Sequence, residues 1–95
     1  MDPKQLFLWR RLTVAFVNLR PICAGHVLVS PRRRVEKYQD LDTQEREALW
    51  QSVSEVHRLL ERVYGHQVQI AIQNGKGSGQ SVSHVHVHCM PCSQE

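Results

Sequence analysis

The sequence lacks the features that mark several large classes of protein. Its apolar segment from Leu12 to Val17 follows two arginines, ends at Asn18 and is too short for a membrane span or a signal peptide. It contains no internal repeats, no low-complexity linker and no Walker pattern. The net charge of +3 is too small to require a nucleic-acid partner. We therefore expect neither a membrane protein nor a nucleic-acid-binding protein.

Cysteine is also scarce, and its number is odd. Cys23, Cys89 and Cys92 occur in a chain without a secretory pattern. We therefore expect free thiols in a reducing, intracellular compartment. With 95 residues, of which 41% are hydrophobic, the chain suits a single domain over residues 1–95. A domain of this size has one core and is small enough for dimerisation to add useful buried area.

Periodicity predicts four β-strands. Apolar alternation or enrichment in strand-forming residues marks the segments 13–18, 25–30, 67–73 and 84–88. In the third segment Val68, Ile70 and Ile72 share one face, which predicts a half-buried strand. A glycine-rich loop joins this strand to the last one, and we expect the two to form a hairpin.

A single long helix is predicted between the second and third strands. Asp42 and Glu45 have the spacing of a capping box, and Gly65 supplies a stop signal. Between them, apolar residues recur at helical intervals from Leu49 to Val63. We therefore expect an α+β domain in which one main helix covers an antiparallel sheet of four to five strands.

The most informative segment is His84-Val85-His86-Val87-His88. Successive side chains of an extended strand point to opposite faces, so an extended conformation places the three imidazoles on one face. Histidine has an unperturbed pKa of about 6.5, which lets it act at neutral pH as a nucleophile, a proton carrier or a metal ligand. The segment therefore predicts a functional site.

A zinc site is one interpretation of this segment, because histidine and the nearby Cys89 and Cys92 are common zinc ligands. The geometry argues against it. His84 and His88 would stand about 13 Å apart along a strand, whereas zinc binds its ligand atoms at about 2.0 to 2.3 Å. Cys89 points away from the face of His88, and the CxxC pair has no second pair. We keep zinc as a minor alternative.

Phosphoryl or nucleotidyl transfer is the interpretation that the surrounding residues favour. A neutral imidazole nitrogen can attack phosphorus and form a covalent intermediate, while neighbouring imidazoles stabilise the charge of the phosphate. The middle histidine, His86, is the natural nucleophile. Backbone N–H groups at Gly77 and Gly79 are candidate donors to phosphate oxygens.

The sequence resembles the histidine triad (HIT) superfamily of nucleotide hydrolases and transferases. The resemblance rests first on His-Val-His-Val-His preceded by Asn-Gly-x-x-x-Gly-Gln-Ser-Val-x. Three upstream segments resemble the fragile-histidine-triad branch, at residues 15–21, 25–29 and 35–41. Gln73 also resembles this branch, since the nucleoside-phosphoramidase branch usually has asparagine there. The chain begins close to the first expected strand, so an N-terminal hairpin of the family could be missing.

The resemblance implies roles for individual residues. His86 would be the nucleophile and His88 would hold phosphate oxygens, while His26 and His84 would orient and polarise the surroundings of the nucleophile. Further residues match family positions that contact the substrate. Asn18 corresponds to the ribose-binding position, and the phosphates and the departing group would contact Gln73, Gly79, Gln80 and Ser81.

The implied substrate is a dinucleoside polyphosphate such as diadenosine triphosphate, cleaved to AMP and ADP. No obligatory cofactor or protein-bound metal is implied, although Mg²⁺ would accompany the substrate. The resemblance also implies a homodimer formed through the helix and a sheet edge, in the cytoplasm and with the nucleus as a second expected location. Two alternatives stay open, namely a nucleoside phosphoramidase and a nucleotide-binding signalling module with little catalysis.

Overall fold

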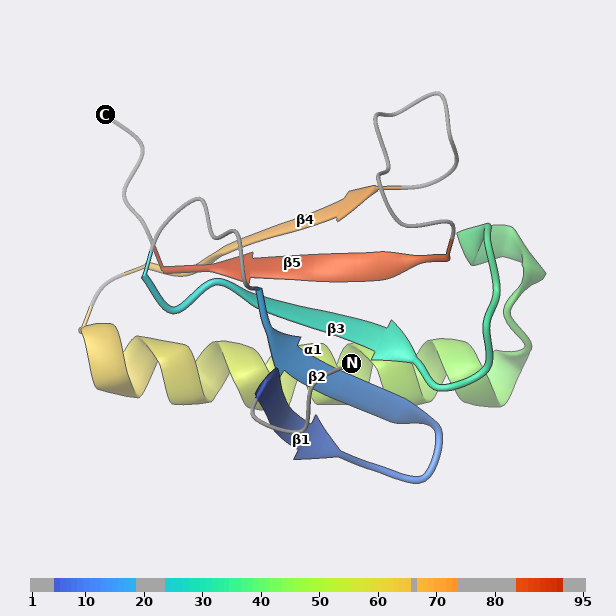
Figure 1. Cartoon of the computed structure of the whole chain (residues 1–95), viewed down its shortest axis with the longest axis horizontal. Helices are drawn as coiled ribbons and strands as arrows, with labels where there is room; N and C mark the ends of the chain where they lie inside the picture. Colours follow the sequence, from blue (N-terminus) through green and yellow to red (C-terminus); the bar gives the residue numbers. More distant parts are fainter. Residues whose placement is uncertain (1–4, 19–23, 66, 74–83, 92–95) are drawn as a thin grey trace.

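The central feature of the chain is a five-stranded antiparallel sheet (Figure 1). The computed structural model describes residues 5–18, 24–65, 67–73 and 84–91. The strands are β1 (Leu6–Trp9), β2 (Thr13–Val17), β3 (Val27–Pro31), β4 (Gln69–Gln73) and β5 (His86–Met90). Their order in the sheet is β1-β2-β3-β5-β4. The predicted α+β architecture is confirmed, and β5 lies between β3 and β4.

The N-terminal part of the sheet differs from the prediction. β1 was not predicted, yet it pairs with β2 with Leu8 opposite Ala15. The described part of the chain therefore starts with a hairpin of β1 and β2 that was not predicted. Strand boundaries also shift by one or two residues: β2 ends at Val17, β3 spans Val27–Pro31, β4 begins at Gln69 and β5 spans His86–Met90.

One long helix, α1 (Thr43–Tyr64), follows a short 3-10 turn at Tyr38–Asp40. The Asp42 carboxylate accepts a hydrogen bond from the backbone N–H of Glu45 at 2.8 Å, and the Glu45 side chain accepts one from the backbone N–H of Asp42 at 3.0 Å. This capping box satisfies two of the N–H groups that a helix start leaves without partners. At the other end Gly65 takes the left-handed conformation with φ of 68°. Both predicted helix ends are confirmed.

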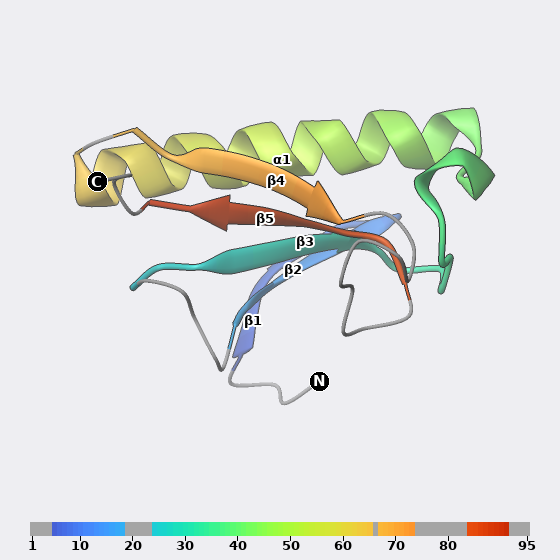
Figure 2. The same ribbon diagram turned by 90° about the horizontal axis from the view of Figure 1, so that it is seen from above.

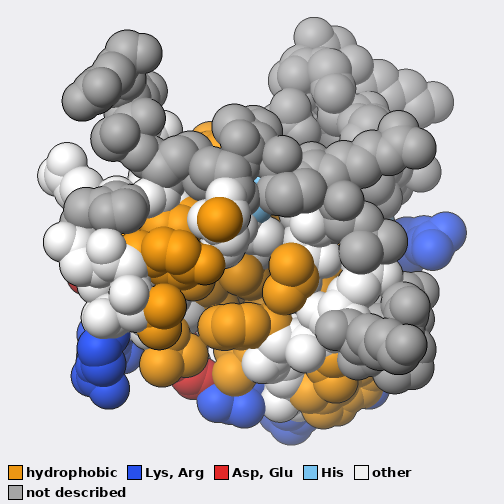
Figure 3. Space-filling view, turned by 60° about the vertical axis from the view of Figure 1, so that its left-hand side comes forward, with side chains coloured by type: hydrophobic (Ala, Val, Ile, Leu, Met, Phe, Trp, Pro, Cys, Tyr) orange, Lys and Arg blue, Asp and Glu red, His pale blue; other side chains and the backbone are white. Residues whose placement is uncertain are grey.

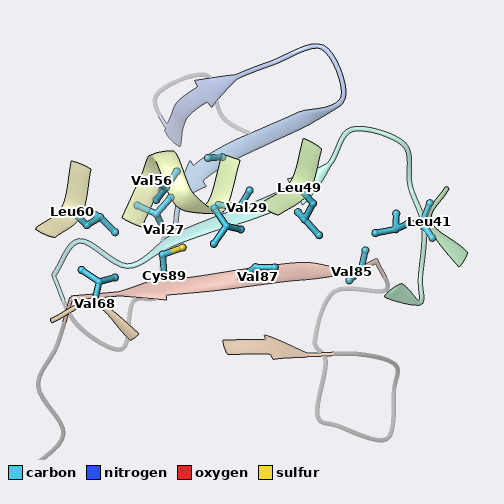
Figure 4. Packing of buried hydrophobic residues seen from close by; sticks show 13 residues of the cluster. Val27, Val29, Leu41, Leu49, Val56, Leu60, Val68, Val85, Val87 and Cys89 are labelled. Atoms are coloured by element: carbon cyan, nitrogen blue, oxygen red, sulfur yellow. The ribbon is translucent and has the colours of Figure 1, made fainter. Parts of the chain in front are cut away.

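The core lies between α1 and one face of the sheet. Figure 2 shows α1 running along a single side of the strands, and Figure 4 shows apolar side chains of the helix and of β3 and β5 meeting there. Val29 of β3 and Val87 of β5 pair in register, and both are fully buried with Leu49 and Val56 of the helix. Alternation therefore assigns one face of β3 and β5 to the core and leaves the other face for different side chains.

The edge strand β4 is less buried than predicted. Only Val68, which precedes the strand, joins the core, whereas Ile70 and Ile72 are 46% and 39% exposed. Both face the helix side, because Ile70 pairs with Cys89 and Ile72 pairs with Val87. The helix, however, packs mainly on β2, β3 and β5. The edge strand therefore presents apolar side chains beyond the cover of the helix.

A second apolar surface lies at the C-terminal end of α1. Figure 3 shows hydrophobic side chains gathered on this part of the molecule. They border a groove of about 340 Å³ whose lining includes Phe7, Val17, Leu59, Val63 and Tyr64. Within the described residues, the structure has no helix with the length and hydropathy needed to span a membrane.

Candidate active site

Four histidines gather on the face of the sheet opposite α1. His86 and His88 belong to β5, His84 precedes that strand, and His26 precedes β3. Alternation along β5 sends His86 and His88 to this face, because the intervening Val87 points into the core. The ring centroids lie 4.9 Å apart for His86 and His88, and 5.0 Å apart for His26 and His88. The ring centroids of His84 and His86 are 6.3 Å apart.

The position of His26 depends on the glycine before it. Gly25 has a φ of 82°, which is a left-handed conformation that residues with a Cβ rarely adopt. A Cβ at this position would also lie 2.6 Å from the ring of Tyr64 at the end of α1. Gly25 therefore lets the chain turn beneath Tyr64 and enter β3 with His26 on the histidine face.

A chain of hydrogen bonds links Asn18, His26 and His88. The Asn18 amide nitrogen lies 3.3 Å from His26 Nδ1, and His26 Nε2 lies 2.8 Å from His88 Nδ1. An amide nitrogen can only donate, so His26 Nδ1 accepts and its Nε2–H donates to His88 Nδ1. The neutral ring of His88 then carries its own proton on Nε2. This series of hydrogen bonds thus fixes an N–H donor at Nε2 of His88.

The ring of His86 has the opposite polarity. Its Nδ1 lies 3.0 Å from the backbone carbonyl oxygen of His84. A carbonyl can only accept, so His86 Nδ1–H donates and Nε2 carries the lone pair. His86 is 3% exposed as a residue, so its surroundings hold the ring in place. Two adjacent imidazoles therefore present different outer nitrogens, a lone pair on His86 and an N–H on His88.

Burial keeps the neighbouring rings neutral. Burial is the main cause that lowers the pKa of His88 to about 4, and the charges of His86 and His26 act in the same direction. Burial and the charge of His86 lower the pKa of His26. The pKa of His84 is lowered by burial, by His86 and by Arg34. Because a charged ring would donate from both nitrogens, these shifts favour the neutral tautomers described above for His26 and His88.

A pocket of about 350 Å³ adjoins His84, one of the four histidines. Its lining combines apolar, polar and cationic side chains, namely Gln5, Val14, Phe16, Ser30, Pro31, Arg32, Arg34 and His84. Val14 and Phe16 belong to β2 and point away from the core because Ala15 between them points into it. The pocket therefore opens beside His84 on the histidine face.

The structure brings together five of the predicted site residues: Asn18, His26, His84, His86 and His88. Gln73 pairs in register with His86, so its backbone lies next to the nucleophile candidate; only the backbone of Gln73 is described. Gly77, Gly79, Gln80 and Ser81 lie outside the described residues.

The pocket residues Val14, Phe16 and Arg34 were not predicted as parts of the site. A sequence signal did exist for two of them, because Val14, Phe16 and Asn18 alternate along one strand and therefore share a face. The position of Arg34 had no such signal, since it follows the end of β3.

The cysteines and the other possible metal ligands test the zinc alternative. The part of the chain that the structure describes contains no group of three or more histidine, cysteine or acidic residues placed to hold a metal ion. Cys89 is fully buried on the helix side, and burial raises the pKa of its thiol to about 12. Cys92 lies outside the described residues. The described cysteine is therefore a packing residue.

Comparisons with known proteins find related sequences and structures. The family model described as HIT domain matches residues 2–95. The bis(5'-nucleosyl)-tetraphosphatase [asymmetrical] of Schizosaccharomyces pombe is 46% identical over 92% of this chain and 48% of its own length. A bifunctional bis(5'-adenosyl)-triphosphatase/adenylylsulfatase of Arabidopsis thaliana is 41% identical over 96% of this chain and 51% of its own length. The chain thus spans about half the length of these curated relatives.

A solved structure shares the fold of this chain. The diadenosine triphosphate hydrolase of Plasmodium falciparum, crystallised in complex with cyclomarin A, superposes with a TM-score of 0.94 at 30% sequence identity. The superposition covers 98% of this chain and 64% of that chain. The five-stranded sheet with its single long helix is therefore shared over almost the whole length of this chain.

Proposed function

This chain belongs to the HIT-domain family, and from that premise we propose that it hydrolyses dinucleoside polyphosphates through a covalent nucleotidyl intermediate on His86. The observation that carries the proposal is the polarity of the two adjacent rings. His86 presents a lone pair at Nε2 because its Nδ1–H is bound to the His84 carbonyl. His88 presents an N–H beside it because its Nδ1 is bound to His26.

In the first step the Nε2 lone pair of His86 attacks the α-phosphorus of the substrate. A P–N bond forms while the P–O bond to the rest of the polyphosphate breaks, and the departing nucleotide takes the electron pair. Positive charge develops on the ring of His86, where the His84 carbonyl at Nδ1 stabilises it. A polyphosphate is already a good leaving group, so the step needs oriented hydrogen bonds more than a strong acid.

His88 holds the phosphoryl group during this step. Its Nε2–H donates to a non-bridging oxygen, where negative charge is concentrated as the bonds change. Because the pKa of His88 is lowered to about 4, the ring stays neutral at pH 7 and keeps a single, fixed donor. We propose that Asn18 and His26 act here as positioning residues.

In the second step water attacks the same phosphorus. The P–N bond breaks, its electron pair returns to His86 Nε2, and the water proton is lost to solvent. The nucleoside monophosphate then leaves and the neutral ring is restored. For diadenosine triphosphate the sum is one water consumed and AMP and ADP released.

The pocket beside His84 is suited to the nucleoside attached to the α-phosphate. Its apolar wall, which includes Val14, Phe16 and Pro31, can contact the faces of a planar base. The volume of about 350 Å³ is of the size that such ligand sites have. The nucleophile and the base pocket then lie on the same face of the sheet.

Diadenosine triphosphate is one substrate that we propose within this class. The support is the printed names of the relatives, of which one acts on bis(5'-adenosyl) triphosphates and another on bis(5'-nucleosyl) tetraphosphates. Mg²⁺ would accompany the substrate, without an obligatory cofactor on the protein.

We also propose a homodimer, because Ile70 and Ile72 leave an apolar surface at the edge strand β4. The cytoplasm, with the nucleus as a second location, stays our expected location.

The proposed function is tested by following hydrolysis in water enriched in ¹⁸O. Purified protein is incubated separately with diadenosine triphosphate, diadenosine tetraphosphate and adenosine phosphoramidate, and the products are separated and weighed by mass spectrometry. We expect the label in AMP, because water attacks the α-phosphorus, and faster turnover of the dinucleotides than of the phosphoramidate. Label in ADP, or nucleotide binding without any turnover, would contradict the proposal.

A further inference from the structure

Three consecutive arginines follow β3, and the structure gives them different surroundings. Arg33 forms a bidentate ion pair with Glu45, with nitrogen–oxygen distances of 2.8 and 2.7 Å. The Arg32 guanidinium lies 4.1 Å from the centre of the Trp9 ring and donates to the Arg11 carbonyl at 2.9 Å. Arg32 and Arg33 are therefore held by other parts of the fold.

Arg34 is the exception. Its side chain is exposed and makes no hydrogen bond or ion pair within the described part of the chain. It lines the pocket beside His84, together with the apolar side chains of β2. It is also close enough to His84 for its charge to act on that ring. A planar group with several N–H donors is thus available at the wall of the proposed base pocket.

The donors of Arg34 distinguish between the two purine bases. Guanine presents two acceptors, O6 and N7, on one edge, and a guanidinium can donate to both of them at once. Adenine presents an acceptor at N7 but a donor at its exocyclic amine, so the same guanidinium would face a donor there. The apolar floor formed by Val14, Phe16 and Pro31 would contact either base equally well.

We propose that Arg34 is a specificity-determining residue that binds the O6 and N7 edge of guanine, so that guanine-bearing dinucleoside polyphosphates are preferred substrates. This inference rests on the proposed function, because it requires the nucleoside of the α-phosphate to occupy the pocket beside His84. A phosphate group is the competing ligand for a guanidinium. The apolar wall of the pocket favours a base, since phosphate would gain nothing from contact with Phe16 or Val14.

The test compares diguanosine triphosphate with diadenosine triphosphate as competing substrates in one reaction. The quantity measured is the ratio of their kcat/KM values, for the wild type and for Arg34→Lys, Arg34→Gln and Arg58→Gln. Arg34→Lys keeps the charge but loses the planar pair of donors. Arg58→Gln removes the same charge from an exposed position on α1, across the sheet from the pocket.

We expect the wild type to favour the guanine substrate and both Arg34 variants to lower the ratio by about tenfold, with no change for Arg58→Gln. If Arg34→Lys keeps the wild-type ratio while Arg34→Gln slows both substrates equally, Arg34 attracts phosphate and the proposal is overturned. An unchanged ratio in both Arg34 variants overturns it as well.

A binding experiment separates this inference from the proposed function. Titration calorimetry with GMP and AMP on the same four proteins needs no turnover. If the wild type hydrolyses neither dinucleotide, the proposed function fails, but tighter binding of GMP that is lost in Arg34→Lys would still support base recognition. Equal affinities for GMP and AMP in the wild type would overturn the inference even if both dinucleotides are hydrolysed.

Discussion

The two faces of β5 have the same backbone and very different chemistry. On the helix side Val87 and Cys89 are fully buried in the core. On the other side His86 is hydrogen-bonded to the His84 carbonyl, and His88 is hydrogen-bonded to His26, the residue before β3. Strand alternation alone separates them, because neighbouring residues along a strand point to opposite faces. One strand therefore holds the core together and carries the reactive groups.

Burial shifts the pKa of a side chain on each face of β5. The shift makes Cys89 unreactive, whereas it keeps His88 in the form that the proposed mechanism uses. Burial raises the pKa of Cys89 to about 12, so the thiol stays protonated and unreactive. It is the main cause that lowers the pKa of His88 to about 4, so the imidazole stays neutral and keeps one defined donor. The comparison shows that burial alone does not make a residue structural, because the uncharged form of an imidazole is the useful one here.

Replacing His86 with alanine is the largest expected change on the histidine face. Turnover of diadenosine triphosphate should fall by more than about a thousandfold, because the attacking nitrogen is removed. The circular dichroism spectrum and substrate binding should remain, since the hydrophobic core does not include this ring. Full turnover by the variant would show that His86 is not the nucleophile.

Replacing the neighbouring Val87 with alanine tests the other face of the same strand. The side chain is fully buried, and the loss of two methyl groups should lower the free energy of unfolding by about 2 kcal/mol. Urea denaturation measures this loss, and turnover per folded molecule should stay close to that of the wild type. A large loss of turnover without a loss of stability would show that the two faces are not separable.

Asn18→Ala should change which ring nitrogens of His26 and His88 carry a proton. Without the amide donor at 3.3 Å, His26 Nδ1 is no longer held as an acceptor, and the tautomer of His88 should become mixed. We expect kcat to fall about tenfold, the size of one lost hydrogen bond. Nitrogen-15 spectra of the ligand-free protein report the tautomer directly, without any contribution from ribose. Unchanged spectra would leave Asn18 without a positioning role.

The smallest expected effect is the acid titration of His88. Its ring should titrate with a pKa of about 4 in the folded protein, against about 6.5 in the unfolded chain. Between these values the unfolded state binds more protons, so the contribution of His88 to stability should decrease as the pH falls from 6.5 to 4. Proton NMR of the ring at a series of pH values measures the midpoint. A midpoint near 6.5 would show that the ring is not desolvated as described.

The sequence predicted those parts of the fold and the site that depend on local pattern. The alternation of His86 and His88 and the helix from Asp42 to Gly65 were both read from residues near one another in sequence, and the structure confirms them. The resemblance to a family, rather than periodicity, identified Asn18 and His26 as site residues. Their hydrogen bonds with His88 depend on β3 lying beside β5, which local sequence does not encode.

The remaining differences have two causes, an uninformative local pattern and the arrangement of distant segments. β1 was missed because Leu6–Trp9 is a run of apolar residues without alternation. Ile70 and Ile72 alternate as a half-buried strand should, yet their exposure depends on where the helix ends its cover of the sheet. The pocket position of Arg34 likewise depends on the packing of four separate segments of the chain, which together line the pocket.

The central claim is that His86 Nε2 forms a covalent bond to the substrate phosphorus. It is tested most directly by mass spectrometry of the intact protein, mixed briefly with diadenosine triphosphate and quenched in alkali, because the adduct is acid-labile. We expect a mass gain of one adenylyl group in the wild type and in Val87→Ala, and none in His86→Ala. An adduct that persists in His86→Ala would show that another residue is the nucleophile. No adduct in a wild type that turns over substrate at the same time would rule out the covalent mechanism.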